Sequence, residues 1–148
     1  MPARHIFVDT NILIYAHDTD AGKKRLRAME LIEALINGPY PPAVSVQILN
    51  ELYVNIQRLS SSKVARTICE SYLDWEIVPL SLDIFRGAID LSARYKLSFW
   101  DASVLQAALK ARAEVVVSED LSHGQFYETL QVVNPFKLGE DWKTELLG

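Results

Sequence analysis

Short apolar runs recur along the chain between segments with helical periodicity, and this alternation constrains the fold more than any other feature of the sequence. Short continuous apolar runs are typical of strands that are buried on both faces of a parallel sheet. The strands predicted in this way are residues 6–8, 43–44, 77–79, 115–117 and 130–133. Because helical segments separate the first four, we predict an α/β fold with a central parallel sheet of about four to five short strands flanked by helices.

Helices are predicted where apolar residues recur at intervals of three and four. The clearest covers residues 23–37, because Asn37-Gly38-Pro39 is a typical stop signal. Serine is a frequent N-cap residue, so Ser45, Ser81 and Ser98 predict where three further helices begin. The complete set is a helix that starts at Thr10, helices over residues 23–37, 45–59, 64–73, 81–92 and 98–112, and at most a short helix within 138–148.

The length of 148 residues suits one domain, so we predict that residues 1–148 form a single domain with a substantial core. Every apolar run is far shorter than the roughly 20 residues that cross a bilayer, and the N-terminal residues lack the apolar stretch of a secretory signal. We therefore expect no membrane partner. Cys69 is the only cysteine, which excludes an internal disulfide and favours a reducing cytoplasm.

The formal net charge of −4 argues against a protein that coats nucleic acid through charge alone. Two local basic groups, within residues 23–27 and 58–66, are either solvated helix faces or contacts for phosphates. Trp75, Trp100 and Trp142 are able to stack on bases, but apolar neighbours favour packing instead. We expect Trp100 to anchor the start of the helix that follows it.

Four acidic residues stand at the ends of strands or near the starts of helices. Asp9 follows the first apolar run, Glu51 lies in the second turn of a predicted helix, Asp101 begins another, and Asp120 follows Val115-Val116-Val117. Ligands of open α/β sheets bind at the carboxyl ends of the strands, where such residues meet. A cluster of carboxylates without His or Cys suits a hard divalent cation such as Mg²⁺, which keeps water ligands for attack on a phosphodiester.

Each acidic residue also has a purely structural interpretation. Asp9 and Asp101 are suitable capping residues for the helices that they begin. Glu51 lies roughly 60° outside the apolar stripe of its helix, where a solvated side chain is common. Asp120 belongs to ordinary loop chemistry after a strand, and Glu119 competes with it for the same role. None of these interpretations explains why the chain has all four.

Four motifs together resemble the PIN-domain family, in the family's order and approximate spacing over nearly the whole chain. They are Asp9-Thr10-Asn11, Glu51-Leu52, Trp100-Asp101-Ala102 and Ser118-Glu119-Asp120-Leu121. More narrowly, the chain resembles the VapC-like toxin ribonucleases of type II toxin-antitoxin systems. The four-point pattern is much more specific than any one of its parts.

The resemblance implies a cytoplasmic endoribonuclease that depends on Mg²⁺ or Mn²⁺, forms a homodimer and is held inactive by a small cognate antitoxin. It implies that the four acidic residues hold the metal and carry the catalysis, Asp9 and Asp101 most firmly and Asp120 at the most variable position. It adds two secondary polar positions. The residues concerned are Asp9, Glu51, Asp101 and Asp120, with Asn11 and Ser118 as the secondary positions.

Two other functions remain open at this point. One is a catalytically silent PIN-like module that binds RNA or an antitoxin. The other is a Mg²⁺ phosphohydrolase acting on a small phosphoester, although position 11 is Asn and the Asp-x-Asp expected of such an enzyme is missing. The many Leu and Ile residues of segment 23–36 suggest an apolar groove for an antitoxin helix or strand.

Overall fold

The computed structural model describes residues 3–148, and its centre is a six-stranded sheet in the order β3-β2-β1-β4-β6-β5. All neighbouring strands are parallel except β5 and β6, which are antiparallel. The strands are β1 (Ile6–Val8), β2 (Ala43–Ser45), β3 (Glu76–Val78), β4 (Val115–Val117), β5 (Phe126–Tyr127) and β6 (Leu130–Val133). The predicted parallel sheet is therefore confirmed.

The strand that the sequence did not predict is β5, which lies at the edge of the sheet and is two residues long. Two residues are too few to produce a recognisable period. Its pairing with β6 depends on a tight turn in which Glu128 has a positive φ of 55°. A non-glycine residue in that conformation is uncommon and gives no turn signal in the sequence.

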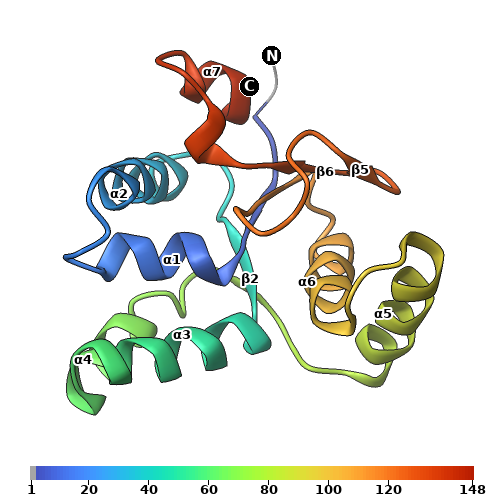
Figure 1. The fold of residues 1–148 in the computed structure, drawn as a ribbon, viewed down its shortest axis with the longest axis horizontal. Coiled ribbons are helices and arrows are strands. Elements are labelled where there is room, and N and C mark those ends of the chain that lie inside the picture. Colours follow the sequence, from blue (N-terminus) through green and yellow to red (C-terminus); the bar gives the residue numbers. More distant parts are fainter. Residues whose placement is uncertain (1–2) are drawn as a thin grey trace.

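Helices cover both faces of the sheet, with α1 to α4 on one side and α5 and α6 on the other (Figure 1). The α-helices are α1 (Thr10–His17), α2 (Lys23–Ile36), α3 (Val46–Leu59), α4 (Ser62–Glu70), α5 (Leu82–Tyr95), α6 (Phe99–Lys110) and α7 (Trp142–Leu147), and a short 3₁₀ helix, η1, spans Pro135–Lys137. Ser45, Ser81 and Ser98 each accept a hydrogen bond from a first-turn backbone N–H, as predicted. None of the helices in the described part of the chain has the length and apolar character to cross a membrane.

The core is built on the two central strands, because every residue of β1 and β4 is at most 2% exposed. The same core contains Trp142 and Leu146 of the C-terminal helix. Trp75 and Trp142 are buried as expected, at 7% and 4% exposure. The expectation that Trp100 packs and anchors its helix is wrong, because its indole is 66% exposed. The capping hydroxyl of Ser98, not the indole, secures that helix start.

The carboxyl ends of β1, β2 and β4 meet at one edge of the sheet because these strands are parallel. Helices α1 and α3 begin at this edge, directly after β1 and β2. Helix α6 leads into β4 through the short connection 111–114, so it runs back along the sheet and its first turn lies toward the same edge. The fold thus directs four chain segments to one end of the sheet. The predicted acidic residues lie on these segments.

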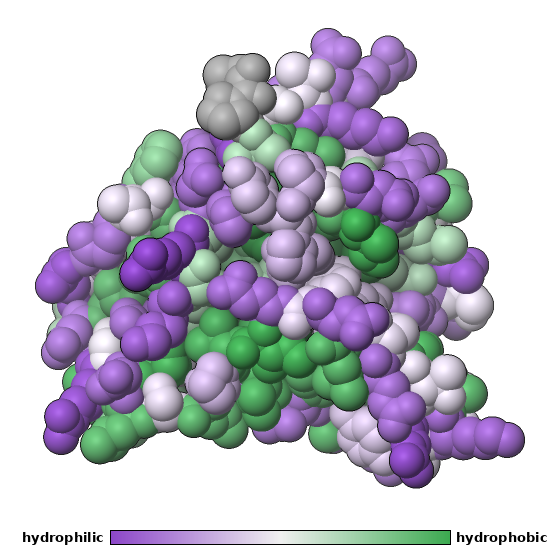
Figure 2. Space-filling view, turned by 180° about the vertical axis from the view of Figure 1, so that it is seen from behind, coloured by the Kyte–Doolittle hydropathy of each residue, from purple (hydrophilic) through white to green (hydrophobic). Residues whose placement is uncertain are grey.

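Surface hydrophobicity is uneven. Figure 2 shows apolar residues gathered in a band across the lower half of one face, below a mainly polar upper half. Contiguous apolar surface of this kind marks sites of interaction more often than scattered apolar residues do.

Candidate active site

Asp9 is both a helix cap and the buried centre of the acidic site. It follows β1, has an extended backbone (φ −77°, ψ 158°), and its Oδ1 accepts a hydrogen bond of 2.8 Å from the backbone N–H of Thr10. The capping interpretation of this residue is therefore correct, but it accounts for only one of the two oxygens. Oδ2 accepts a 2.6 Å hydrogen bond from the hydroxyl of Ser118 at the end of β4. The side chain is 8% exposed.

Burial raises the pKa of Asp9 to about 6, from an ordinary value of 3.8. The hydrogen bonds from Ser118 and Thr10 act in the opposite direction but do not offset the loss of hydration. The negative charges of Asp120 and Glu51 raise the pKa further. These three carboxylates are therefore near enough to repel one another, and no cationic side chain is among the groups that shift this pKa.

Asn11 connects the first strand end to the loop after β4. Its Nδ2 donates to Asp120 Oδ2 at 2.9 Å and to Asp9 Oδ2 at 3.5 Å, and its Oδ1 accepts from the backbone N–H of Glu119 at 3.3 Å. The Ser118 hydroxyl also accepts from the backbone N–H of Asp120 at 3.2 Å. The two predicted secondary positions, Asn11 and Ser118, thus lie between Asp9 and Asp120 and hold them in place.

Glu119 and Asp120 point to different partners, which resolves the competition between them. Glu119 accepts hydrogen bonds from the Tyr15 hydroxyl and the Lys24 ammonium, both at 2.5 Å. Burial alone raises the pKa of Glu119, but the hydrogen bonds from Lys24 and Tyr15 outweigh it and keep the pKa below its ordinary value. Glu119 is therefore committed to α1 and α2, whereas Asp120 is the acidic residue of this loop at the site.

Glu51 faces α1 and not the solvent. Its Oε2 accepts a 2.7 Å hydrogen bond from the Thr10 hydroxyl, and its Oε1 accepts one of 3.2 Å from Gln47 Nε2. The side chain is half-buried, so the interpretation of a solvated helix position is wrong. Its position outside the apolar stripe turns it toward the start of α1, which packs against α3.

Asp101 occupies the first turn of α6, where its backbone N–H donates to Ser98 Oγ at 3.1 Å. Its capping interpretation is correct for the backbone, but within residues 3–148 its carboxylate makes no hydrogen bond or ion pair. The topology directs it to the same edge as Asp9, without contact. The residues that hydrogen bonds join into one site are Asp9, Asn11, Glu51, Ser118 and Asp120 with Thr10.

The chemistry of these donors suits a divalent cation. Carboxylate, amide and hydroxyl oxygens are the ligands that Mg²⁺ and Mn²⁺ prefer, and a cation would offset the burial of Asp9 and its repulsion by Asp120 and Glu51, which together raise its pKa. The ligand set is not closed, because across residues 3–148 no three side chains of His, Cys, Asp or Glu converge closely enough to hold one ion. Hydrogen bonds to Thr10, Asn11 and Ser118 occupy the oxygens of Asp9 instead.

Sequence reasoning missed four side chains that orient the acids. Thr10 and Gln47 hold Glu51, and Tyr15 and Lys24 hold Glu119. Gln47 was detectable, because residues four apart on a helix face each other. The others come from helices that meet only in the folded chain.

The model of the PIN domain family matches residues 6–128, so the chain belongs to the PIN domain family. No curated protein matches the chain. The α/β fold with its mostly parallel central sheet is that of this class of proteins.

Three of the solved structures that the chain resembles are of toxin-antitoxin proteins. A toxin-antitoxin complex from Klebsiella pneumoniae shares 26% identity at a TM-score of 0.67, covering 90% of this chain and 99% of that one. VapC20 of Mycobacterium tuberculosis, a toxin that cleaves the sarcin-ricin loop, shares 17% identity at 0.63, covering 78% and 89%. VapBC2 of Rickettsia felis, bound to a promoter DNA fragment, shares 17% at 0.61, covering 86% and 96%.

Proposed function

We propose that the protein is a metal-dependent endoribonuclease that hydrolyses RNA phosphodiester bonds and is the toxin of a type II toxin-antitoxin pair. The observation that carries the proposal is the joining of Asp9, Glu51 and Asp120 through Thr10, Asn11 and Ser118 at the carboxyl edge of the sheet. Membership of the PIN family and the likeness to toxin-antitoxin structures support it.

Asp9, Glu51, Asp101 and Asp120 are the residues that would hold Mg²⁺ or Mn²⁺. When bound, such an ion stabilises negative charge on phosphate oxygens and lowers the pKa of a water ligand. The protein's own groups prepare the site. Ser118 and the Thr10 N–H orient Asp9, Asn11 orients Asp120, and a carboxylate of the set accepts the proton that the attacking water loses.

The test is cleavage of RNA in Mg²⁺ or Mn²⁺, with and without chelator. We expect chelator to abolish cleavage, and Asp9→Asn and Asp101→Asn to reduce it by at least about a hundredfold, as loss of a metal ligand or of charge stabilisation does. Asp74→Asn is the matched control, because Asp74 is exposed and belongs to the turn before β3. Full activity of both site variants would end the proposal.

A catalytically silent module that binds RNA or antitoxin is the second candidate, favoured by the ligand set that does not converge on one point. It predicts RNA binding that persists in chelator, with no cleavage by the unaltered protein at any Mg²⁺ or Mn²⁺ concentration. Cleavage that is lost in Asp9→Asn excludes it.

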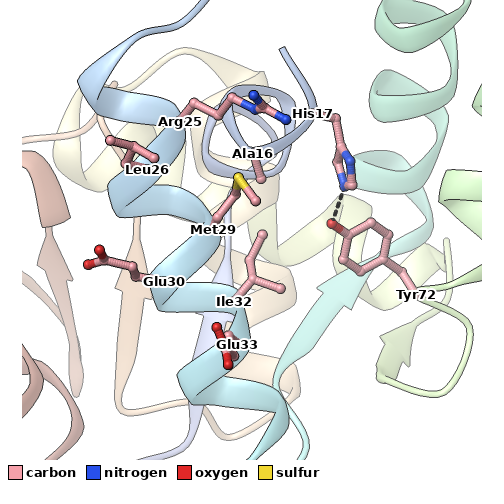
Figure 3. A pocket seen from close by; sticks show the side chains of 9 residues that line it. All are labelled: Ala16, His17, Arg25, Leu26, Met29, Glu30, Ile32, Glu33 and Tyr72. Carbon is pink, nitrogen blue, oxygen red and sulfur yellow. Dashed lines mark hydrogen bonds between the residues drawn. The ribbon is translucent and has the colours of Figure 1, made fainter. Parts of the chain in front are cut away.

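The proposed antitoxin site is a pocket of about 520 Å³ between α1, α2 and Tyr72 (Figure 3). Leu26 and Met29 are 62% and 44% exposed on its α2 wall, and the Nε of Arg25 is buried without a hydrogen-bond partner in residues 3–148. An amphipathic helix or strand that presents apolar side chains to Leu26 and Met29 would fit this pocket. Protection of the α2 amides from exchange on antitoxin binding is the expected result, and an unprotected α2 would exclude this site.

Three further properties belong to the same proposal. A homodimer is proposed from the resemblance and is tested by light scattering of the purified protein. A cytoplasmic location is proposed from the resemblance and from the unpaired Cys69. One domain over residues 1–148 is proposed because α7 contributes to the same core as the sheet, and partial proteolysis that removed α7 without unfolding the rest would contradict it.

A further inference from the structure

An aromatic hollow lies beside the acidic site, between α3, the start of α5 and the start of α6. We use this name for the concave surface formed by Phe85, Phe99 and Trp100 together with Gln47 and Asn50. Its volume is about 270 Å³. A hollow of this volume is large enough to receive one nucleobase.

Trp100 is the most exposed large apolar residue of the part of the chain that the structure describes, at 66%. It contacts Phe99 edge-to-face, with the ring centres 5.4 Å apart, and Phe99 in turn lies 5.9 Å from Phe85. Despite this contact, most of the surface of Trp100 remains exposed to solvent. Trp100 and Asp101 are neighbours in the first turn of α6, so the hollow and this candidate metal ligand share the same helix start.

The opposite wall of the hollow carries amides. Gln47 Nε2 donates to Glu51 Oε1 at 3.2 Å, so this wall is joined to the acidic site by a direct hydrogen bond. Asn50 is exposed one turn away on the same helix. A planar aromatic surface facing amide donors and acceptors is the combination that proteins use to hold unpaired bases, which stack on the ring and pair at their edges.

The charge of the protein favours a contact with RNA that does not depend on phosphate neutralisation. The net charge is −4, and none of the side chains that line the hollow in the described residues is basic. Neutralisation of phosphates, the usual main source of affinity for nucleic acid, is weak under these conditions. Stacking of bases on aromatic side chains does not depend on charge and contributes substantially per base.

We propose that the aromatic hollow binds one unpaired nucleobase of RNA, stacked on Trp100 with its edge toward Gln47 and Asn50, beside the scissile phosphodiester. The inference rests on the proposed function and deepens it, because it defines the substrate as RNA with an unpaired base next to the cut. Trp100 is then a substrate-binding residue.

A second copy of the chain is the competing occupant, because Leu80, Leu82 and Ile89 are also exposed near the hollow, at 62%, 61% and 46%. The amide wall favours the base. A second protein surface that packed against Gln47 and Asn50 would bury their amide groups. Each buried amide then needs a hydrogen-bond partner of matching geometry, and one left without a partner reduces the binding free energy. A base edge supplies both donors and acceptors.

The experiment uses the full chain, a short unpaired RNA oligonucleotide and its duplex form, in chelator so that nothing is cleaved. Trp75 and Trp142 are buried, so Trp100 provides the solvent-accessible tryptophan fluorescence. We expect the unpaired oligonucleotide to quench this emission and to protect it from acrylamide, and the duplex to do neither. Trp100→Ala should weaken oligonucleotide binding roughly tenfold, within the range known for loss of a stacked base, and Trp100→Phe by only about threefold.

Phe126→Ala is the matched control, because Phe126 is equally exposed, at 59%, but lies on the edge strand β5 outside the aromatic hollow. It should leave binding unchanged. In metal, Trp100→Ala should raise KM with little change in kcat. Equal binding by Trp100→Ala and the unaltered protein would overturn the proposal. So would an indole that becomes shielded from acrylamide in the RNA-free protein as the protein concentration rises. That second result would identify a second copy of the chain as the occupant of the hollow.

The two proposals fail differently. Quenching by unpaired RNA without cleavage in any metal supports the aromatic hollow and removes the nuclease. Cleavage with an unquenched Trp100 supports the nuclease and removes the base-binding role of the hollow.

Discussion

Asp9→Asn should inactivate the proposed nuclease and yet stabilise the fold at neutral pH. The pKa of Asp9 is about 6 in the folded protein and near 3.8 when the chain is unfolded. The folded state therefore binds a proton at this residue more tightly, and the stability that it contributes is present below about pH 4 and is lost as the pH rises through 6. At 1.36 kcal/mol for each pKa unit, ionised Asp9 lowers the free energy of unfolding by about 3 kcal/mol at pH 7.

An asparagine carries no charge to bury, so the variant does not lose this stability as the pH rises. The two oxygens of Asp9 each accept a hydrogen bond, but asparagine has only one oxygen, and its NH₂ group cannot accept the other bond. This loss reduces the gain in the free energy of unfolding. We expect a net gain of about 1–3 kcal/mol at pH 7 and none near pH 4.

The assay is urea unfolding of both proteins in chelator at several pH values between 4 and 8. The quantity compared is the difference in the free energy of unfolding between Asp9→Asn and the unaltered protein. The other carboxylates titrate in the same pH range in both proteins, so their contributions cancel in this difference. Added Mg²⁺ should stabilise the unaltered protein and reduce the difference, since a bound cation compensates the ionised carboxylate. A variant that is less stable at every pH, or a difference that does not change with pH, would refute the reasoning about burial and charge.

Four other substitutions test the acidic site and the core. Ser118→Ala removes the hydroxyl that donates a hydrogen bond to buried Asp9. Urea unfolding at pH 7 should show a free energy of unfolding lower by about 1.5–3 kcal/mol. NMR titration in chelator should show that the pKa of Asp9 has risen further. Asn11→Ala should lower RNA cleavage about 10- to 100-fold without unfolding the protein, because Asp120 loses its partner; steady-state kinetics and circular dichroism check both parts. Leu52→Ala, at a fully buried position, should cost about 2–5 kcal/mol in urea unfolding, whereas Leu26→Ala at an exposed one should change stability by less than about 0.5 kcal/mol.

Much of the fold was predictable because it depends on short-range patterns. The five predicted strands and the helices between them follow from apolar runs and helical spacing, and the capping serines fix the helix starts. Asp9 was predictable as a site residue for the same reason, since a strand end followed by a helix start places it at the edge of the sheet.

The orientation of the other acids depends on contacts between distant segments. Glu51 turns toward α1 because α1 and α3 pack together, which helical phase within α3 alone does not reveal. Asp120 rather than Glu119 faces the site because Lys24 and Tyr15, far earlier in the chain, bind Glu119. The exposure of Trp100 was missed because Phe99 and not the indole packs inward at the start of α6.

The sequence by itself therefore determined the order of elements, the parallel sheet and the edge at which the acids gather. Only the tertiary structure decided which oxygen each acid presents, which neighbour holds it and which aromatic ring is left open beside it. The physical reason is that propensity, periodicity and capping act within a few residues, whereas the hydrogen bonds from Ser118 to Asp9 and from Asn11 to Asp120 each join residues 109 positions apart.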